Sequence, residues 1–384
     1  MSPSSELRIA PRPLLPIYLS CLAFGLQVGT GMPLVPLALE HRGSDNLTIG
    51  IVSAAWGIGM IATAHLIPAA AARLGAVRLI CASILLNAAI SVVFAYTQDV
   101  ALWFGLCLLS GAVGGVPWVV SEIWINLVVD ESRRGRAVAI YSTLVALGLA
   151  VGPLVLQVVG VYGPRPFLVN AALGLLVILP LLPGWRLAPP IRPMGGGGFG
   201  SVVLLAPVAL LAALACGLGE QVAFSFLPIF AIEAGLSAES GATWLSAFVI
   251  GNLALQWPIG WMADHLDRRA VLAACALSSA ALVASVTALD PRGYGTLGVL
   301  VLWGGISFGI YTVGLAVLGQ RFKGGDIARA NAAFTIVYTL GGLIGRPIVG
   351  GAMDMMGRPG LTLTLAFFYA LAGIVALLAF LRRR

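Results

Sequence analysis

The sequence predicts an all-α membrane protein with twelve transmembrane helices in two six-helix halves. Three observations carry this prediction: the composition, the number of long apolar runs and the placement of basic residues. Of the 384 residues, 59% are hydrophobic and only 10% are charged, and the mean hydropathy is +1.00. A soluble domain carries about 25% charged residues. This chain therefore cannot cover a water-facing surface, which excludes an ordinary cytosolic enzyme and requires lipid as its solvent.

Twelve apolar runs are long enough to cross about 30 Å of hydrocarbon as helices. In chain order they cover residues 14–39, 48–71, 79–97, 101–129, 137–160, 166–184, 201–230, 241–262, 270–289, 295–319, 331–353 and 361–380. A segment rich in proline and glycine follows the sixth run. We therefore expect an N-terminal half at 1–184, a cytoplasmic linker at 185–200 and a C-terminal half at 201–384.

The basic residues are distributed unequally between the two sides of the membrane. With the N terminus inside, 17 of the 22 basic residues fall in inner segments, whereas only four fall in outer loops. Because positive charge is retained on the cytoplasmic side, we expect both termini in the cytoplasm. The net charge of +7 then reflects topology, not binding to nucleic acid. Lys323 is the only lysine in the sequence, which is typical of a GC-rich bacterial genome, so the expected location is the bacterial plasma (inner) membrane.

A weak internal repeat relates the two halves at an offset of about 192–194 residues. Gly25 with Pro36 corresponds to Gly217 with Pro228. The stretch at 146–155 corresponds to the stretch at 340–349. Repeated halves are a feature of secondary transporters.

Three motifs resemble those of the major facilitator superfamily (MFS), and the resemblance covers nearly the whole chain. Residues 260–269, GWMADHLDRR, resemble the G-x-x-x-D-R-x-G-R-R loop of the family, with His265 and Asp267 as departures. The equivalent loop after the second run keeps Arg73, Gly75 and Arg78 but has Ala72 in place of the aspartate.

The third motif lies in the fifth run. Its residues 148–153, GLAVGP, resemble the G-x-x-x-G-P element of exporters in the family, and 342–347 form a degenerate copy in the eleventh run. The resemblance implies a proton-coupled secondary active transporter, of the antiporter type, that moves a small solute by alternating access and exports it. We expect a monomer in the lipid bilayer.

The resemblance also implies a set of gating residues. They are Asp264, Arg268, Arg269, Arg73, Arg78, Gly148, Gly152 and Pro153. In the alternative interpretation, the charges only fix topology and the glycines only allow close packing.

Three charged residues fall inside the predicted spans, and each costs about 2.5–3.5 kcal/mol near a helix centre. Glu220 lies eight residues before Pro228, and Arg346 lies eight residues before Asp354. This equal depth predicts a salt bridge between them, which either breaks during transport or simply holds the half together.

The third charge, Glu122, lies eight residues before Asp130. His65 lies eight residues before Arg73, at a similar depth in the same half. A Glu–His pair away from bulk water can exchange protons near neutral pH, so we expect Glu122 to couple transport to protons. Alternatively, Glu122 orders the inner arginine cluster and His65 only packs.

Other polar and aromatic side chains in the runs complete the candidate substrate and proton site. They are Gln27, Trp118, Asn126, Gln221, Phe224 and Tyr311.

Two functions of other classes stand beside the transporter as alternatives. Residues 305–309, GISFG, fit the G-x-S-x-G motif and suggest an intramembrane hydrolase with Ser307 as its nucleophile. That motif, however, needs a strand-to-helix turn. A transport-inactive receptor or scaffold needs no titrating residue. We expect no catalytic residue, no metal and no cofactor. A nucleotide-binding G-x-x-x-x-G-K-[ST] motif is absent from the sequence, and the five cysteines are expected to be small buried hydrophobes.

Overall fold

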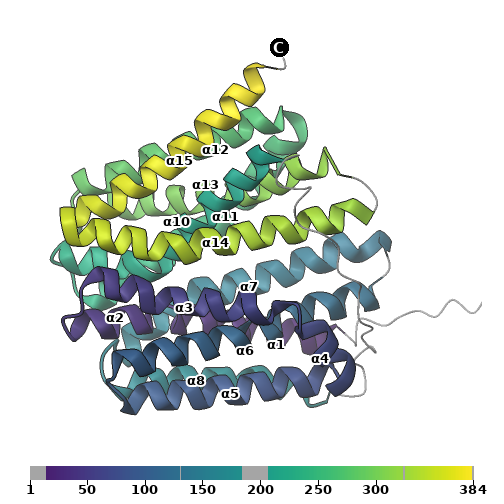
Figure 1. The fold of residues 1–384 in the computed structure, drawn as a ribbon, viewed down its shortest axis with the longest axis vertical. Helices are drawn as coiled ribbons and strands as arrows, with labels where there is room; N and C mark the ends of the chain where they lie inside the picture. The colour runs from purple at the N-terminus through teal and green to yellow at the C-terminus, as the bar shows by residue number, and fades with distance from the viewer. Residues whose placement is uncertain (1–13, 130, 184–205, 323–324, 383–384) are drawn as a thin grey trace, which may run out of the picture.

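The computed structural model describes residues 14–129, 131–183, 206–322 and 325–382, which fold entirely into helices and their connections (Figure 1). The predicted linker at 185–200 lies outside the described residues, as do the side chains of Asn126, 131–135 and 325–329. The helices are α1 (Leu15–Gly31), α2 (Leu34–His41), α3 (Asn46–Ala64), α4 (Ile67–Leu74), α5 (Ala76–Tyr96), α6 (Val100–Val128), α7 (Glu131–Val159), α8 (Pro164–Ile178), α10 (Pro207–Glu233), α11 (Ala238–His265), α12 (Arg268–Ser285), α13 (Tyr294–Gly319), α14 (Gly325–Met356) and α15 (Arg358–Leu381), with 3₁₀ turns η1 (Leu179–Leu181) and η3 (Val286–Ala288).

These helices confirm the predicted all-α membrane fold. Within the described residues, 11 helical segments are long and apolar enough to span a bilayer. The twelfth crossing is α11, whose 28 residues extend about 42 Å at 1.5 Å per residue. Helix α11 is more polar than the others because Glu239, Asp264 and His265 lie near its two ends, where water is accessible, and because Asn252 and Gln256 lie in its interior.

Two of the predicted continuous spans are in fact interrupted, which corrects their description. The first, 14–39, consists of α1 and α2 with a break before Pro33, and the second, 48–71, consists of α3 and α4 with a break before Pro68. Proline has no N–H to donate to the preceding turn, so the hydrogen-bond ladder of the helix is interrupted at both positions. The break after α3 places His65 at a helix C-terminus and not in a helix interior.

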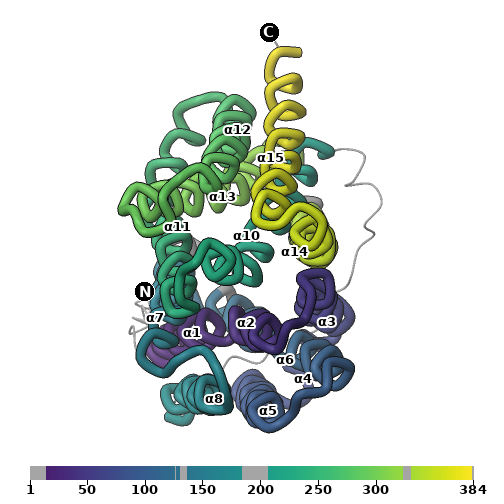
Figure 2. Tube along the Cα trace, turned by 90° about the vertical axis from the view of Figure 1, so that its left-hand side faces the viewer, coloured from purple at the N-terminus to yellow at the C-terminus, as the bar shows by residue number. Residues whose placement is uncertain are grey.

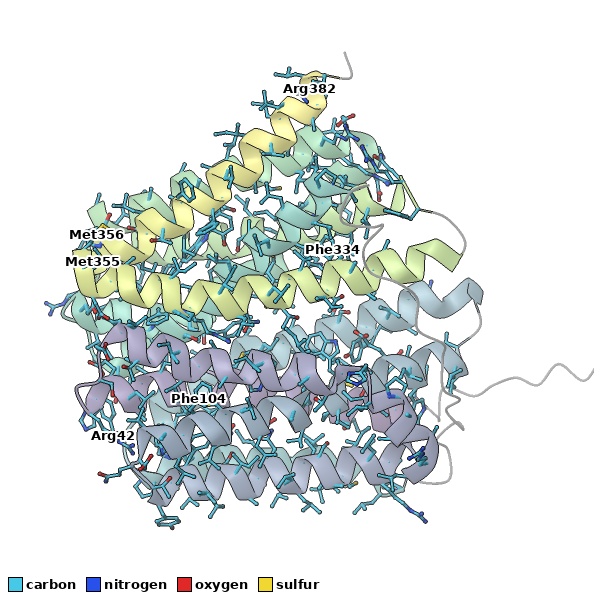
Figure 3. All side chains as sticks on the ribbon, in the orientation of Figure 1. Arg42, Phe104, Phe334, Met355, Met356 and Arg382 are labelled. Carbon is cyan, nitrogen blue, oxygen red and sulfur yellow. The ribbon has the colours of Figure 1, made fainter. Side chains whose placement is uncertain are left out.

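The helices pack mainly within two groups and meet along two seams. Helices α1 to α8 pack together, as do α10 to α15 (Figure 1). Between the groups, α3 packs along α14 and α7 packs along α11 (Figure 2). We use "proximal end" for the end at which α1 begins and α15 terminates near Arg382, and "distal end" for the opposite one, which carries Arg42 and Met355 (Figure 3).

Four pairs of helices cross at glycines. A Cβ at Gly25 would overlap the backbone of Val145, where α1 crosses α7, and one at Gly217 would overlap Tyr338, where α10 crosses α14. Likewise Gly111 faces the Trp56 carbonyl between α6 and α3, and Gly304 faces the Phe248 carbonyl between α13 and α11. Small residues let helix backbones approach where lipid provides no hydrophobic drive between them.

The same contacts fix the register of the internal repeat. The contacting residues of α1 and α3 recur 192 positions later in α10 and α11, respectively. Those of α6 and α7 recur 193 positions later in α13 and α14. Gly148 and Gly152 of α7 therefore correspond to Gly341 and Gly345 of α14, which shifts the sequence-based alignment of this stretch by one residue.

Helix α15 shows how the outer surface of the bundle meets lipid. Its exposed large side chains recur at intervals of three or four residues and therefore share one face. They are Leu363, Phe367, Leu371, Ile374 and Leu378. A continuous exposed apolar stripe of this length is suited to the hydrocarbon of a bilayer and not to water.

Candidate functional site

The predicted salt bridge between Glu220 and Arg346 is wrong in its pairing. Both residues lie at the boundary of α10 and α14, but the Arg346 guanidinium donates to the Gln221 side-chain oxygen through Nη2. Its Nε donates to Ser225 Oγ at 3.1 Å, and its Nη1 donates to the backbone oxygen of Ser53 at 3.1 Å. The Ser53 contact joins α14 to α3 and so connects the two groups of helices.

Glu220 is connected to Arg346 through two intervening side chains. The Tyr338 side chain interacts with the Glu220 carboxylate, and Gln221 Nε2 donates to the Tyr338 hydroxyl at 3.5 Å. The four side chains therefore form a relay from the guanidinium through an amide and a phenol to the carboxylate. The positions of the two charges along the chain predict their depth but not the intermediaries, because depth alone does not specify which side chain faces which.

Glu122 in α6 has a different environment. Its Oε1 accepts a hydrogen bond of 2.8 Å from the indole Nε1 of Trp118, one helical turn away. The ring of Trp118 packs edge-on against Phe24 of α1, with 6.5 Å between centroids. The Glu122 side chain itself remains exposed, so this carboxylate is held by an aromatic donor while still open to its surroundings.

The expected pair of His65 with Glu122 is not formed. Among the described side chains, no hydrogen bond, ion pair or ring contact joins them, and the His65 side chain is exposed at the break between α3 and α4. The break is the physical reason, because the expected pairing assumed one continuous helix, whereas α3 ends at Ala64 and His65 caps it.

The other candidates differ in their surroundings. Gln27 lines a cavity in the first group of helices, and Tyr311 packs edge-on against Tyr338 with 5.3 Å between ring centroids. Phe224 is 1% exposed and belongs to the apolar core, so it does not face a cavity in this conformation. Asn126 lies in α6, but its side chain is outside the described part of the chain.

The loop between α11 and α12 ties the proximal ends of three helices of the second group together. Asp267 caps α12 by accepting from the backbone N–H groups of Arg269 and Ala270. Arg268 donates to the backbone oxygen of Ala316 at 2.9 Å, at the end of α13, and Arg269 donates to that of Ala379 at 2.8 Å, at the end of α15. Guanidinium groups bound to the last carbonyls of a helix complement its dipole.

The remaining gating candidates are mostly exposed. Asp264, Arg73 and Arg78 have exposed side chains at the proximal end. Pro153 lies inside α7. Gly148 and Gly152 form the α1–α7 crossing, where a Cβ at Gly152 would lie 2.6 Å from the Gly29 carbonyl carbon. The predicted close packing at these glycines is confirmed, whereas a movement at them stays a prediction.

At the distal end, polar contacts join the two groups of helices, and sequence analysis missed them. The Asp354 carboxylate of α14 accepts from the backbone N–H groups of Asn46 at 2.9 Å and Leu47 at 2.8 Å, and so caps α3. The adjacent Asp45, which occupies the N-cap position, makes no side-chain capping bond. On the other seam, Gln157 of α7 donates to the Thr243 hydroxyl of α11. The sequence signal for such contacts was the presence of acidic residues, such as Asp354, at the ends of the predicted spans.

Ser307 lacks the geometry of a nucleophile. It lies inside continuous helix α13, is 2% exposed, and its hydroxyl donates to the Gly304 backbone oxygen at 3.0 Å. A G-x-S-x-G nucleophile instead requires a sharp turn that exposes the serine. Among the described residues, His, Cys, Asp and Glu form no group of three that could hold a metal ion.

The fold and these motifs define a polytopic transporter, and comparison with known proteins assigns the family. The family model described as Major Facilitator Superfamily matches residues 17–243 and 209–384, so the chain belongs to this superfamily. The superfamily consists of transporters and not enzymes, which overturns the hydrolase alternative.

Curated relatives and solved structures agree with this assignment. The chain is 25% identical over 335 residues, 85% of each chain, to YfkF of Bacillus subtilis, an uncharacterized MFS-type transporter. It is 25% identical over 347 residues, 88% of each chain, to the uncharacterized MFS-type transporter YcaD of Escherichia fergusonii. The crystal structure of a point mutant of the nucleoside transporter NupG superposes with a TM-score of 0.77 at 16% identity, covering 96% of this chain and 99% of that one.

Proposed function

We propose that this protein is a proton-coupled secondary active transporter that exports a small solute by rocking two halves around a shared site. The halves are residues 1–184 and 201–384, joined by a linker at 185–200. The proximal end, with both termini, faces the cytoplasm of a bacterium, and the protein acts as a monomer in the plasma membrane. Membership of the superfamily supports transport of a small solute; the coupling and the direction are our inference.

The distal contacts between the halves are the observation that carries this proposal. Asp354 caps α3 across one seam, and Gln157 binds Thr243 across the other. At the proximal end, by contrast, Arg268 and Arg269 bind helix ends of their own half. This asymmetry supports a state that is closed at the distal end, and breaking a few exchangeable polar contacts would allow the opposite state.

Two carboxylates support coupling to protons. Glu122 in one half accepts from the Trp118 indole, Glu220 in the other half interacts with Tyr338, and neither forms an ion pair among the described residues. Moving an unpaired carboxylate away from water costs free energy that binding a proton removes. Glu122 is the better coupling candidate because its side chain is exposed, whereas Glu220 is held in the relay.

The proposal is tested with purified protein in liposomes that contain a pH-sensitive dye. A thermal-shift screen at two pH values first identifies a solute that stabilises the protein. A gradient of that solute should then drive proton movement, and Glu122→Gln should abolish it while solute binding persists. The matched control is Glu239→Gln at the distal end of α11, which should transport normally. Unchanged proton flux in Glu122→Gln would remove this carboxylate from the mechanism.

The same experiment addresses the transport-inactive receptor or scaffold. A receptor binds the solute and shows the thermal shift, but it carries no flux and is insensitive to Glu122→Gln. Solute binding without any flux in the wild-type protein would therefore favour that alternative and overturn the transporter.

A further inference from the structure

A cavity with a largely apolar wall and several polar side chains lies within the N-terminal half, close to the distal end. Its volume is about 120 Å³, and it is lined by α1, α2, α3, α5, α6 and α8 together with Ser225 and Arg346 of the C-terminal half. A single buried water requires only roughly 10–15 Å³, so the cavity holds several waters or one small solute. Glu122 and Glu220, the carboxylates of the proposed coupling mechanism, do not line it.

The lining of this cavity is rich in amides and hydroxyls. These side chains are Gln27, Ser83, Asn87, Ser91, Ser110 and Asn170. Some are paired with each other, since Asn87 Nδ2 donates to Ser110 Oγ at 3.2 Å and Asn170 Nδ2 donates to Ser91 Oγ at 3.4 Å. Buried polar atoms normally have partners, yet Asn170 Oδ1 and Ser53 Oγ have none among the described residues. The cavity therefore offers hydrogen-bonding capacity that the described chain does not use.

Arg346 gives the cavity a positive charge without a counter-charge. Among the described residues it alone brings a charge to the lining, and it is 4% exposed. No carboxylate of the described chain lies within ion-pair distance of it. A guanidinium has five N–H groups, and the hydrogen bonds of Arg346 to Gln221, Ser225 and Ser53 occupy three of them. Buried charges are normally paired, so the remaining N–H groups are suited to an anion.

Two further side chains that line the cavity, Trp56 and Asn87, carry N–H donors. The point where a Cβ of Gly114 would stand is 3.4 Å from the indole Nε1 of Trp56 and 3.6 Å from Asn87 Nδ2. Trp56 and Ser53 are three residues apart on α3 and therefore share one face. The Ser53 carbonyl, to which the Arg346 guanidinium donates, is one helical turn along α3 from Trp56. The lining thus combines charged and neutral N–H donors and includes no carboxylate of the described chain.

We propose that this cavity is a binding site for a small monovalent carboxylate, with Arg346 as its counter-charge and Trp56 and Asn87 as additional donors. A cavity of about 150 Å³ holds benzene, which limits the solute to about six non-hydrogen atoms, as in acetate or lactate. Guanidinium–carboxylate hydrogen bonds are charge-assisted and stronger than those to a neutral amide. The site is distinct from the proposed coupling carboxylates, and its occupancy does not depend on whether the protein transports protons.

The first test compares each carboxylate with its neutral isostere on the wild-type protein in detergent. Sodium acetate and sodium lactate are titrated against acetamide and lactamide, with ionic strength held constant by a bulky sulfonate that the cavity excludes. We expect the unfolding midpoint to rise by roughly 3 °C at a hundred times Kd for the carboxylates and to stay unchanged for the amides. An equal rise with the amides would overturn the proposal, as would a rise with sodium chloride and none with acetate.

The second test uses variants that locate the site. Gly114→Ala places a methyl group in the space between the donors at ordinary contact distances and should weaken acetate binding at least tenfold. Gly105→Ala on the same helix, where no atom lies within 4 Å, should bind normally. Arg346→Gln should also lose binding, and Arg346→Lys should retain part of it; the exposed Arg165→Gln is the control for charge. Unchanged acetate affinity in Gly114→Ala would contradict this location even if the Arg346 variants failed to fold.

Equilibrium binding separates this inference from the proposed function. Acetate binding without any flux in liposomes would leave the carboxylate site intact and reject the transporter. Proton-coupled flux of a solute together with no acetate binding would do the reverse.

Discussion

The two halves of the molecule share their glycine crossings but differ in the chemistry beside them. Gly25 and Gly148 recur as Gly217 and Gly341, with the same neighbouring backbone atoms in contact. In this register, the four side chains of the relay occupy positions that hold apolar or small residues in the first half. Glu220, Gln221, Tyr338 and Arg346 correspond to Val28, Gly29, Val145 and Pro153.

The caps of the equivalent helices α3 and α11 differ in a similar way. Ser237 caps its own helix α11 by accepting from Ser240 N–H at 3.2 Å. Its counterpart Asp45 does not cap α3, and Asp354 of the other half provides the carboxylate instead. The packing contacts of the two halves are therefore repeated, whereas their polar contacts are not. The cap of α11 comes from its own half, and the cap of α3 comes from the other half.

The largest predicted effect tests the shared part of the comparison. Gly111→Ala and Gly304→Ala each place a Cβ into a backbone carbonyl of the crossing helix. Overpacking of this kind costs about 1–3 kcal/mol or more, and both variants should lower the unfolding midpoint in detergent by a similar amount. Gly298→Ala, with no atom within 4 Å, should raise it slightly because alanine favours helix. A clear loss in only one of the two crossings would break the equivalence.

A smaller effect tests the relay. Tyr338→Phe removes the hydroxyl that connects Gln221 to Glu220 and leaves both groups without that partner, so we expect a loss of about 1–3 kcal/mol. The control is Tyr141→Phe in the first half, whose buried hydroxyl has no partner among the described residues and whose removal should cost nothing. Thermal unfolding of the two variants measures the difference; equal stability would show that the relay contributes no stability.

The smallest predicted stability effect concerns the distal cap. Asp354→Ala removes both hydrogen bonds to the α3 N terminus, and loss of an N-cap costs about 0.5–2 kcal/mol. Asp45→Ala, which removes a carboxylate from the same turn without a capping bond, should be neutral. Asp354→Ala should also make a cysteine introduced at the distal seam react faster with a water-soluble maleimide. Equal labelling rates in the two variants would mean that Asp354 does not hold the seam closed.

The sequence is sufficient to predict the fold class and close packing at glycines. The bilayer sets the composition and length of each span, and close helix contacts in lipid need small residues. It is insufficient for the partners of the buried charges. Glu220 and Arg346 lie at the same boundary of α10 and α14, but their relay depends on Tyr338, which resembles an ordinary aromatic in an apolar run. The prediction for His65 is wrong because the apolar run in the sequence is uninterrupted and gives no sign of the break before Pro68. The Asp354 cap joins residues more than 300 positions apart, and one sequence does not encode that proximity in any local pattern.

Alternation between two states is the central claim, and paired distances measure it most directly. Spin labels at Asp45 and Met355 report the distal seam, and labels at Leu74 and Asn331 report the proximal end, on a background without native cysteines. When the pH is shifted across the range that supports flux in the presence of the stabilising solute, the distal distance should lengthen while the proximal distance shortens. Distances that stay constant, or that lengthen together at both ends, would contradict the account.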